Sequence, residues 1–540
     1  MNALAGTVRL THLALRRDRL TLPIWILALA GFLSATTALW ASELSNHADL
    51  VQDTEVAAGS AGIRMLGLAS GATIGAYAMV RDFLLLAVLA ALMSTFAIVR
   101  HTRQGEETGR AELVGAAVVG RAAALAAAMI VTVAANVVLA LLLALGLIVT
   151  GQPTAGSLVA GAAVAGVGIV FAGIAAVTSQ LASTTRGASG MAAAVLGVSF
   201  LLSGVGNMAG QVDSTGLTVH SAWPSWLSPI GWGQQMRPFG GDHWWPLVLA
   251  VVLTGACVAL AGVLVSRRDF GSGLVPQRAG PARAGRALRS PFGLAFRLQR
   301  GALLGWAVAM LGFGLVMGGL AAQVRDSTGA SRDWYLETGG TESIVDAYRA
   351  SILQMAGAAA AMYVVQVLLR LRTEEADGPL EVILATAVGR IRWVAGYAVT
   401  ALLGAIALVL LFALGVGTTA GGTLGDPARQ IARVVGPALV QLPGILVIGG
   451  VVVALIAVLP RYAVVASWTV MLWSILAGPL FGPGLNLPQW ALNSSPFTHV
   501  PKAPAVEITV LPVSGLLAAT ASITLAGLLW LRHRDTKLPA

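Results

Sequence analysis

Two short charged segments interrupt a chain that otherwise consists of long apolar runs. They are RQGEETGRAELVGAAVVGR at residues 103–121 and RTEEADGPLEVILATAVGR at residues 372–390. Their glutamates could bind a partner protein, or could simply solvate the ends of membrane helices, with Arg121 and Arg390 anchored at the lipid headgroups. Acidic residues are unexpected here, because the cytoplasmic face of a membrane favours Lys and Arg. Their presence in both segments favours the docking of a cytoplasmic partner.

The two charged segments match one another. At an offset of 269 residues they agree without a gap at eight of 19 positions. A second match, at an offset of 281, aligns residues 13–32 with residues 294–313 at nine of 20 positions, and PSWLSP (224–229) loosely matches PQWALNSSP (488–496). Biased composition does not easily align Arg, Glu, Trp and Gly in the same order, so the sequence predicts a tandem duplication.

The composition requires a membrane. Hydrophobic residues make up 56% of the chain and charged residues 11%, and the mean hydropathy is +0.80. A water-soluble core could not hide that much apolar surface. The net charge of +10 is spread over short loops instead of one basic patch, so it indicates membrane topology and not nucleic-acid binding.

Twelve stretches of about 20 apolar residues are long enough to cross the hydrocarbon. With the N-terminus inside, 25 of the 34 Lys and Arg residues fall on the side of both termini, which predicts cytoplasmic termini in the cell membrane. Six spans per copy is an even number, so the sequence predicts an all-α polytopic membrane protein of two parallel six-helix repeats. The expected spans are residues 22–42, 79–99, 122–149, 156–180, 189–207, 244–265, 302–322, 350–369, 394–417, 434–459, 463–481 and 510–531.

The same pattern predicts the order of the parts along the chain. A stretch rich in Arg, Gly and Pro separates the two copies and is the expected linker. The expected parts are an N-terminal interfacial helix at 1–21, a first six-span half at 22–265, a cytoplasmic linker at 266–293, a second interfacial helix at 294–301, a second six-span half at 302–531 and a cytoplasmic tail at 532–540.

Three features together carry a family resemblance. They are a basic amphipathic segment before the first span, the pattern E-x-x-G-x-x-E followed by A-x-x-V-G-R between spans two and three, and proline with aromatic residues before span six. The chain resembles the permeases of ABC-2 type exporters, which have the type V exporter fold. Its twelve fused spans are similar to the polyketide-antibiotic (tetronasin-type) exporter permeases of high-GC bacteria.

The resemblance implies a role for the two charged segments. In that family the loop after the second span forms a coupling helix that binds a groove of the ATPase subunit. Pro379 stands where the first copy has Arg110, so the two docking surfaces are expected to differ. The residues that the resemblance implies for coupling are Glu106, Glu107, Gly109, Glu112, Arg121, Glu374, Glu375, Gly378, Glu381 and Arg390.

The chain lacks the sequence of an ATPase. Neither Lys502 nor Lys537 follows the glycine pattern of a P-loop, so ATP and Mg²⁺ are expected on a separate ABC ATPase subunit, in two copies, one per half. We expect a transport subunit that is no enzyme, holds no cofactor or metal of its own, and exports lipophilic or amphipathic antibiotics, drugs or lipids across the lipid membrane. The alternatives are a membrane scaffold or sensor and a proton-coupled multidrug transporter, which would need a membrane-buried carboxylate; Asp82 lies near the edge of a span.

Further polar and aromatic residues suggest a path and a gate. Their alternative role is ordinary packing, interhelical hydrogen bonding or an aromatic belt at the membrane interface. The predicted substrate-path residues are Ser199, Ser203 and Asn207 in the fifth span and Met355, Met362, Tyr363 and Gln366 along one side of the eighth. By resemblance to the family's re-entrant segments, the predicted extracellular gate residues are Trp226, Pro229, Trp490 and Pro496.

Overall fold

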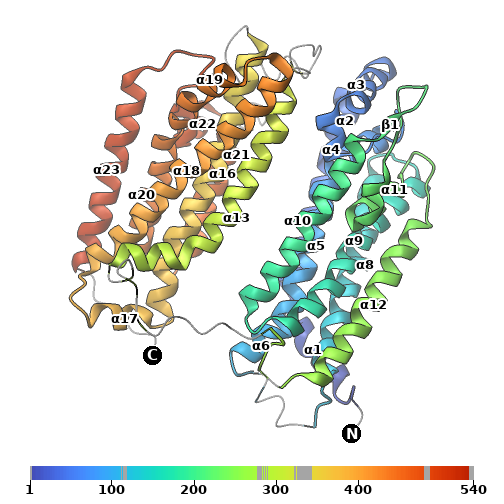
Figure 1. Cartoon of the computed structure of the whole chain (residues 1–540), viewed down its shortest axis with the longest axis horizontal. Helices are drawn as coiled ribbons and strands as arrows, with labels where there is room; N and C mark the ends of the chain where they lie inside the picture. Colours follow the sequence, from blue (N-terminus) through green and yellow to red (C-terminus); the bar gives the residue numbers. More distant parts are fainter. Residues whose placement is uncertain are drawn as a thin grey trace. The chain divides into compact units, whose positions relative to one another are not determined.

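The structure is a computed structural model in which the chain forms two compact units, Met1–Gly280 (unit 1) and Pro281–Ala540 (unit 2) (Figure 1). Most of the described chain is helical, as the sequence predicts. Its two strands, β1 (Gln211–Val212) and β2 (Val219–His220), form one short antiparallel hairpin. The described residues are 3–110, 112, 118–269, 271–275, 283, 285, 288, 290–321, 324, 343–478 and 487–533.

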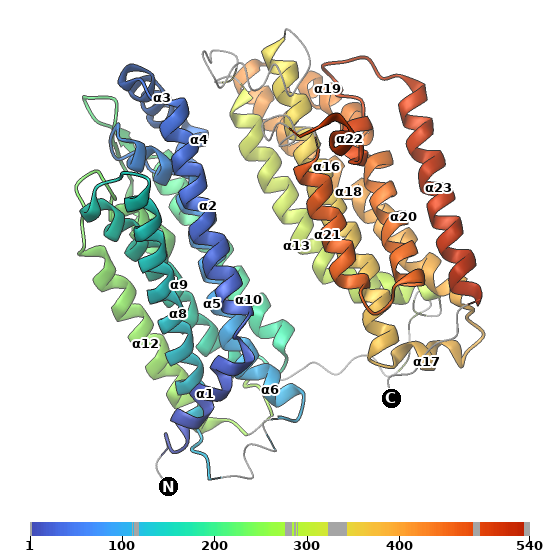
Figure 2. The same cartoon turned by 180° about the vertical axis from the view of Figure 1, so that it is seen from behind.

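The helix before the first span and the first charged segment of unit 1 lie at the same end of the unit. Figures 1 and 2 both show α1 and α6 at the end of unit 1 opposite to α3 and α4. The helices are α1 (Thr7–Arg17), α2 (Thr21–Glu43), α3 (His47–Gly59), α4 (Ala61–Leu66), α5 (Ile74–His101), α6 (Arg103–Glu107), α8 (Ala123–Val149), α9 (Thr154–Leu181), α10 (Thr185–Met208), η1 (Trp223–Leu227), α11 (Pro229–Gln235) and α12 (Pro246–Arg267).

Unit 2 has the same sequence of long helices. In both units the second long helix leads directly into a short segment, α6 in unit 1 and α17 in unit 2. The helices of unit 2 are α13 (Pro291–Gly319), α16 (Ile344–Ala376), α17 (Pro379–Leu384), α18 (Arg390–Leu424), α19 (Pro427–Leu439), α20 (Leu442–Val458), α21 (Ala463–Leu476), α22 (Gln489–Asn493), η3 (Pro496–His499) and α23 (Val510–His533).

Eleven helices of the described chain are long and apolar enough to cross a membrane, counting α5 with α6 and α19 with α20 as single spans. This confirms a polytopic membrane protein. The segment expected as the remaining span, 463–481, contains α21, whose 14 residues rise only about 21 Å, less than the roughly 30 Å of a hydrocarbon core. Residues 479–486, which follow it, lie outside the described residues.

The two units pack their helices in the same pairs. In unit 1, α2 packs on α8, α5 on α9, and α9 on α12; in unit 2, α13 packs on α18, α16 on α20, and α20 on α23. One contact recurs at the level of residues. Gly146 of α8 faces Ala30 of α2, and Gly415 of α18, at the predicted offset, faces Leu311 of α13. Because a glycine has no side chain, it lets the two helix backbones approach closely, as is common between helices in lipid.

The units differ where the chain enters its first span. In unit 1, α1 ends at Arg17 and is followed by Asp18, whose carboxylate binds Arg100 Nη1 and His101 Nε2 at 2.6 Å each. In unit 2 the equivalent residue is Gln299, and it lies inside one continuous helix, α13. The prediction of a separate interfacial helix at 294–301 is therefore wrong. An uncharged Gln offers no ion pair that would fix the chain in a break between two helices.

Candidate functional site

The two charged segments form corners with the same backbone conformation. Gly109 follows α6 with a φ of +71°, and Gly378 precedes α17 with a φ of +95°. Residues with a side chain rarely adopt this left-handed conformation, which explains why both copies have glycine here. Past each glycine the chain makes the same turn, because the amides of Glu112 and Glu381 donate to the carbonyl oxygens of Gly109 and Gly378 at 3.2 and 3.0 Å.

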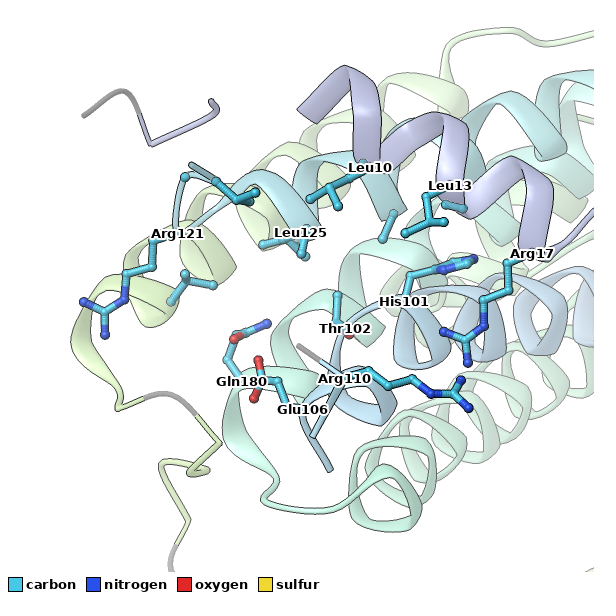
Figure 3. A pocket seen from close by; sticks show the side chains of 18 of the residues that line it. Leu10, Leu13, Arg17, His101, Thr102, Glu106, Arg110, Arg121, Leu125 and Gln180 are labelled. Carbon is cyan, nitrogen blue, oxygen red and sulfur yellow. The ribbon is translucent and has the colours of Figure 1, made fainter. Parts of the chain in front are cut away.

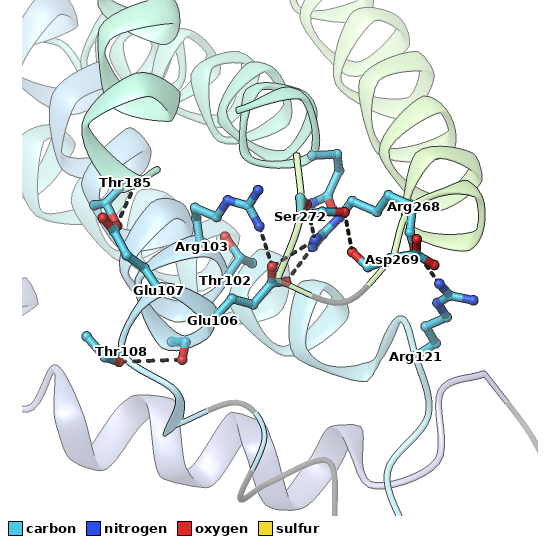
Figure 4. Close-up of polar contacts among 12 residues, drawn as sticks. Thr102, Arg103, Glu106, Glu107, Thr108, Arg121, Thr185, Arg268, Asp269 and Ser272 are labelled. Atoms are coloured by element: carbon cyan, nitrogen blue, oxygen red, sulfur yellow. Dashed lines mark hydrogen bonds and ion pairs between the residues drawn. The ribbon is translucent and has the colours of Figure 1, made fainter. Parts of the chain in front are cut away.

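Glu106 is bound inside unit 1, so it is not free to contact a partner. Its side chain is 10% exposed and accepts from Arg103 Nη1 at 2.5 Å (Figure 4). Arg268 binds it with both terminal nitrogens, one of them at 2.7 Å, and Arg268 Nε donates to Gln180 Oε1 at 2.7 Å. A forked arginine–carboxylate pair is a strong, geometrically specific contact. Neither Arg268 nor Gln180 was among the predicted site residues, and no local sequence pattern marks them.

Glu107 contacts the first residue of α10. Its carboxylate accepts from the backbone amide of Thr185 at 2.8 Å and also from the Thr185 hydroxyl (Figure 4). Thr185 is the first residue of α10, where unpaired amides and the helix dipole favour a negative charge. Glu107 therefore connects α6 to α10. Its side chain is still exposed, so its negative charge is accessible at the surface.

In unit 2 the buried acid is Glu374. It is 3% exposed and accepts from Trp393 Nε1 at 2.9 Å and from the Tyr397 hydroxyl. Glu375, which matches Glu106, lies 3.6 Å from Arg372. The expectation that Glu374 contacts an ATPase is not compatible with this burial, because both of its oxygens face the interior of unit 2.

Glu112 and Glu381 are the matched glutamates that lie on the surface of both units. Glu381 is in the first turn of α17, and residues 111 and 113–117 around Glu112 lie outside the described residues. Arg121 donates to the backbone carbonyl of Arg268, and Arg390 is the first residue of α18. Among the predicted coupling residues, the exposed carboxylates are therefore Glu107, Glu112 and Glu381. Their coupling role stays a prediction.

The polar stripe of α10 has partners within unit 1. Ser199, Ser203 and Asn207 are all buried. The Ser203 hydroxyl and the Asn207 amide donate to Gln234 Oε1 at 2.7 and 2.8 Å. These bonds hold α11 against α10, and Gln234 was not predicted from the sequence. A place on the substrate path stays a prediction for these residues.

The predicted path residues of α16 do not all share one face. Met355 and Gln366 are exposed, Met362 is half-buried, and Gln366 Oε1 accepts from Trp306 Nε1 at 2.8 Å. Tyr363 is instead fully buried in the core of unit 2. Successive helix residues are turned by about 100°, and the Tyr363 ring packs against Gly404 of α18. The prediction that the four line one side is wrong for Tyr363.

The two proline–aromatic segments share a proline at the start of a short helix but differ in the surroundings of their tryptophans. Trp226 stacks on Trp245 with ring centroids 5.1 Å apart, and Pro229 begins α11. In unit 2, Pro496 begins η3 and is buried, whereas Trp490 of α22 is 71% exposed. Trp226 and Trp490 therefore lie in different surroundings. The gating role of the four residues stays a prediction.

The serine before each of these prolines makes an equivalent contact. The Ser228 hydroxyl donates to the carbonyl oxygen of Ser199 in α10 at 2.6 Å, and the Ser495 hydroxyl donates to that of Ser474 in α21 at 2.7 Å. Each segment is therefore fastened to a helix of its own unit, α10 in unit 1 and α21 in unit 2. Non-helical backbone at membrane depth requires such internal partners.

Comparison with known proteins shows the family. The multidrug efflux system permease protein Rv1217c of Mycobacterium tuberculosis (strain ATCC 25618 / H37Rv) is 36% identical over 543 residues, covering 98% of this chain and 95% of that protein. The chain belongs to the Rv1217c permease family. A family model described as "Multidrug efflux system permease Rv1217c, C-terminal domain" also matches residues 288–532, within unit 2.

Membership of the Rv1217c family agrees with the architecture. The eleven apolar helices found among the described residues, with a match over 98% of the chain to a permease, make this chain a multi-pass membrane transport protein. The sequence prediction of a transmembrane permease of the multidrug-efflux class is confirmed, and the chain is a transport subunit. As a permease of an efflux system, Rv1217c also implies further components in the working assembly.

Proposed function

We propose that this Rv1217c-family chain is the permease of an ABC-2 type exporter, driven by a separate ATPase that binds ATP and Mg²⁺. Two ATPase copies dock, one on each unit, and both termini lie in the cytoplasm. The cargo is a lipophilic or amphipathic compound such as an antibiotic, a drug or a lipid. Support comes from the membrane body and from the relative, whose name describes a multidrug efflux system.

The observation that carries the proposal is the matched pair Glu112 and Glu381. Both are exposed, both follow a left-handed glycine, and both have the same backbone bond to that glycine. The neighbouring acids Glu106 and Glu374 are bound inside their units. Contacts within each unit thus account for the presence of the buried acids Glu106 and Glu374. They do not account for the exposed glutamates Glu112 and Glu381. Two equivalent negative positions suit two equivalent basic grooves on a partner.

The test uses the full chain with a candidate ATPase that carries a P-loop. Glu112→Lys with Glu381→Lys should abolish co-purification and cargo-stimulated ATP hydrolysis, because like charges would then face each other. Glu55→Lys with Glu507→Lys is the matched control, since both residues are exposed and are expected at the other membrane face. Unimpaired hydrolysis and efflux in the first variant would contradict the docking model.

One observation favours the proton-coupled alternative. Asp82 lies within α5, is 6% exposed, and accepts from the Thr36 hydroxyl at 2.7 Å. It is thus more deeply buried than its place near a span edge suggests, and intramembrane carboxylates are often functional. In vesicles without nucleotide, an imposed pH gradient should move no cargo if an ATPase is the motor. Nucleotide-free transport that Asp82→Asn stops would favour the alternative.

A further inference from the structure

Unit 1 contains a cavity of about 760 Å³ at the end that carries α1 and α6 (Figure 3). Its walls come from α1, from the last turns of α5, α9 and α12, from α6 and from the first turns of α8. This volume lies within the range of roughly 300–1,000 Å³ that is typical of sites for small molecules. Leu13 lines the cavity and is still 56% exposed, so the cavity opens beside α1.

One side of the cavity is apolar. Leu10 and Leu13 of α1 face Leu125 of α8 across it, and Val265 of α12 and a series of alanines complete the wall. These side chains can bind hydrocarbon but offer no hydrogen bond. The cavity therefore suits the apolar part of an amphiphile better than a fully polar molecule.

The rim of the cavity is cationic. Arg16, Arg17, Arg110 and Arg121 line it. Figure 3 shows Arg17 and Arg110 pointing toward the same place, and both side chains are exposed. Partial desolvation, together with the positive charges of Arg110 and Arg100, lowers the pKa of Arg17. Within the part of the chain that the structure describes, no carboxylate forms an ion pair with Arg17 or Arg110.

The nearby acids do not neutralise this rim. Asp18 is bound by Arg100 and His101, and Glu106, which lines the cavity, is bound by Arg103 and Arg268. Each carboxylate already has two basic partners. The charge that remains at the cavity is positive, and it would attract an anionic group.

The equivalent space in unit 2 is filled. Three small residues of the cavity wall correspond, at the offset of 269, to three large buried residues in unit 2. The matched pairs are Gly105 and Glu374, Ala124 and Trp393, and Ala128 and Tyr397. Trp393 and Tyr397 both donate hydrogen bonds to the Glu374 carboxylate, as described above. One copy of the duplicated corner is therefore packed solid, and the other is open.

We propose that the cavity of unit 1 binds an anionic amphiphile, with its carboxylate or phosphate head between Arg17 and Arg110 and its hydrocarbon part against Leu10, Leu13 and Leu125. The ligand is either an acidic membrane lipid or an acidic amphiphilic compound free in the cell, since both present this chemistry. Binding there requires no ATPase, so it can be tested independently of the energy source proposed above.

The experiment measures ligand binding to the purified full chain in dodecyl maltoside by native mass spectrometry. The probes are palmitate against methyl palmitate, and palmitoyl lysophosphatidylglycerol against palmitoyl lysophosphatidylcholine. One anionic probe molecule should bind at least about tenfold more tightly than its uncharged or zwitterionic counterpart, because charge-assisted hydrogen bonds to arginine are lost in the latter. Preference for the lysolipid identifies a membrane lipid as the source, and preference for palmitate identifies a free amphiphile.

Two variants locate the site. Arg17→Gln with Arg110→Gln should weaken anionic binding about tenfold or more, whereas Arg297→Gln with Arg392→Gln, the same charge change at exposed positions of unit 2, should leave it unchanged. A triple variant with Gly105→Glu, Ala124→Trp and Ala128→Tyr transfers the filling of unit 2 and should abolish binding. Equal binding of the neutral counterparts, or undiminished binding by the double arginine variant, would overturn the proposal.

Discussion

The charged corners of units 1 and 2 have the same backbone turn and different interiors. In unit 1 the corner is held by ion pairs from Glu106 to Arg103 and Arg268 beside a cavity, and in unit 2 Glu374 is enclosed by Trp393 and Tyr397. The features that match are the left-handed glycine and the exposed glutamate after it. The two copies therefore share the surface that a partner could contact, but they differ inside. The corner of unit 1 contains a cavity, and that of unit 2 is filled by large side chains.

The largest effect should come from removing the buried acid of the filled corner. Glu374→Ala would leave the Trp393 indole N–H and the Tyr397 hydroxyl without their partner, at a cost of about 2–4 kcal/mol in the free energy of unfolding. Denaturant titration of the full chain in mixed micelles measures this cost. Glu381→Ala, at an exposed position of the same corner, is the control and should change the stability by less than about 0.5 kcal/mol. Equal effects would show that Glu374 does not hold the corner.

An intermediate effect should appear equally in both units. Gly109→Ala and Gly378→Ala each place a side chain at a left-handed φ, which costs about 1–2 kcal/mol. Each variant should also weaken ATPase binding, because the turn that presents Glu112 or Glu381 is distorted. Gly190→Ala, inside α10 with nothing near the added methyl group, is the matched control. If only one of the two variants lost stability or ATPase binding, the two corners would not be equivalent.

The smallest effect should be a pH dependence that belongs to unit 1. Burial alone would raise the pKa of Asp18, but hydrogen bonds and positive charge from His101 and Arg100 outweigh it, so the pKa is lowered from 3.8. The stabilisation is complete above pH 3.8 and is lost as the pH falls toward the lowered value of the folded state. Unfolding measured between pH 5 and 2 should therefore show a shallower acid slope in Asp18→Asn. Gln299, at the matched position of unit 2, has no titratable group and adds nothing to the pH dependence of stability. Gln299→Ala should therefore leave the acid slope unchanged.

Much of the fold could be predicted from local sequence, and much of the site could not. Apolar length places the spans, and the alignment of Arg, Glu and Gly identifies matched corners whose glycines do adopt one conformation. Sequence spacing could not show that Glu106 meets Arg268, which lies 162 residues further along the chain. It predicted an interfacial helix before the first span in both copies, and so missed that unit 2 has none, because the break in unit 1 depends on Asp18 binding Arg100 and His101 of another helix.

The sequence by itself determined the membrane as solvent, the helical class and the duplication, because each follows from hydrophobic length or from residue matches along the chain. Only the tertiary structure decided which glutamates are exposed and which are bound. A charge near a membrane helix is stabilised by whichever groups surround it in space, and these come from distant helices such as α12 and α18. For the same reason a cavity exists in unit 1, where small residues line the wall, while the matched place in unit 2 is closed by an indole and a phenol.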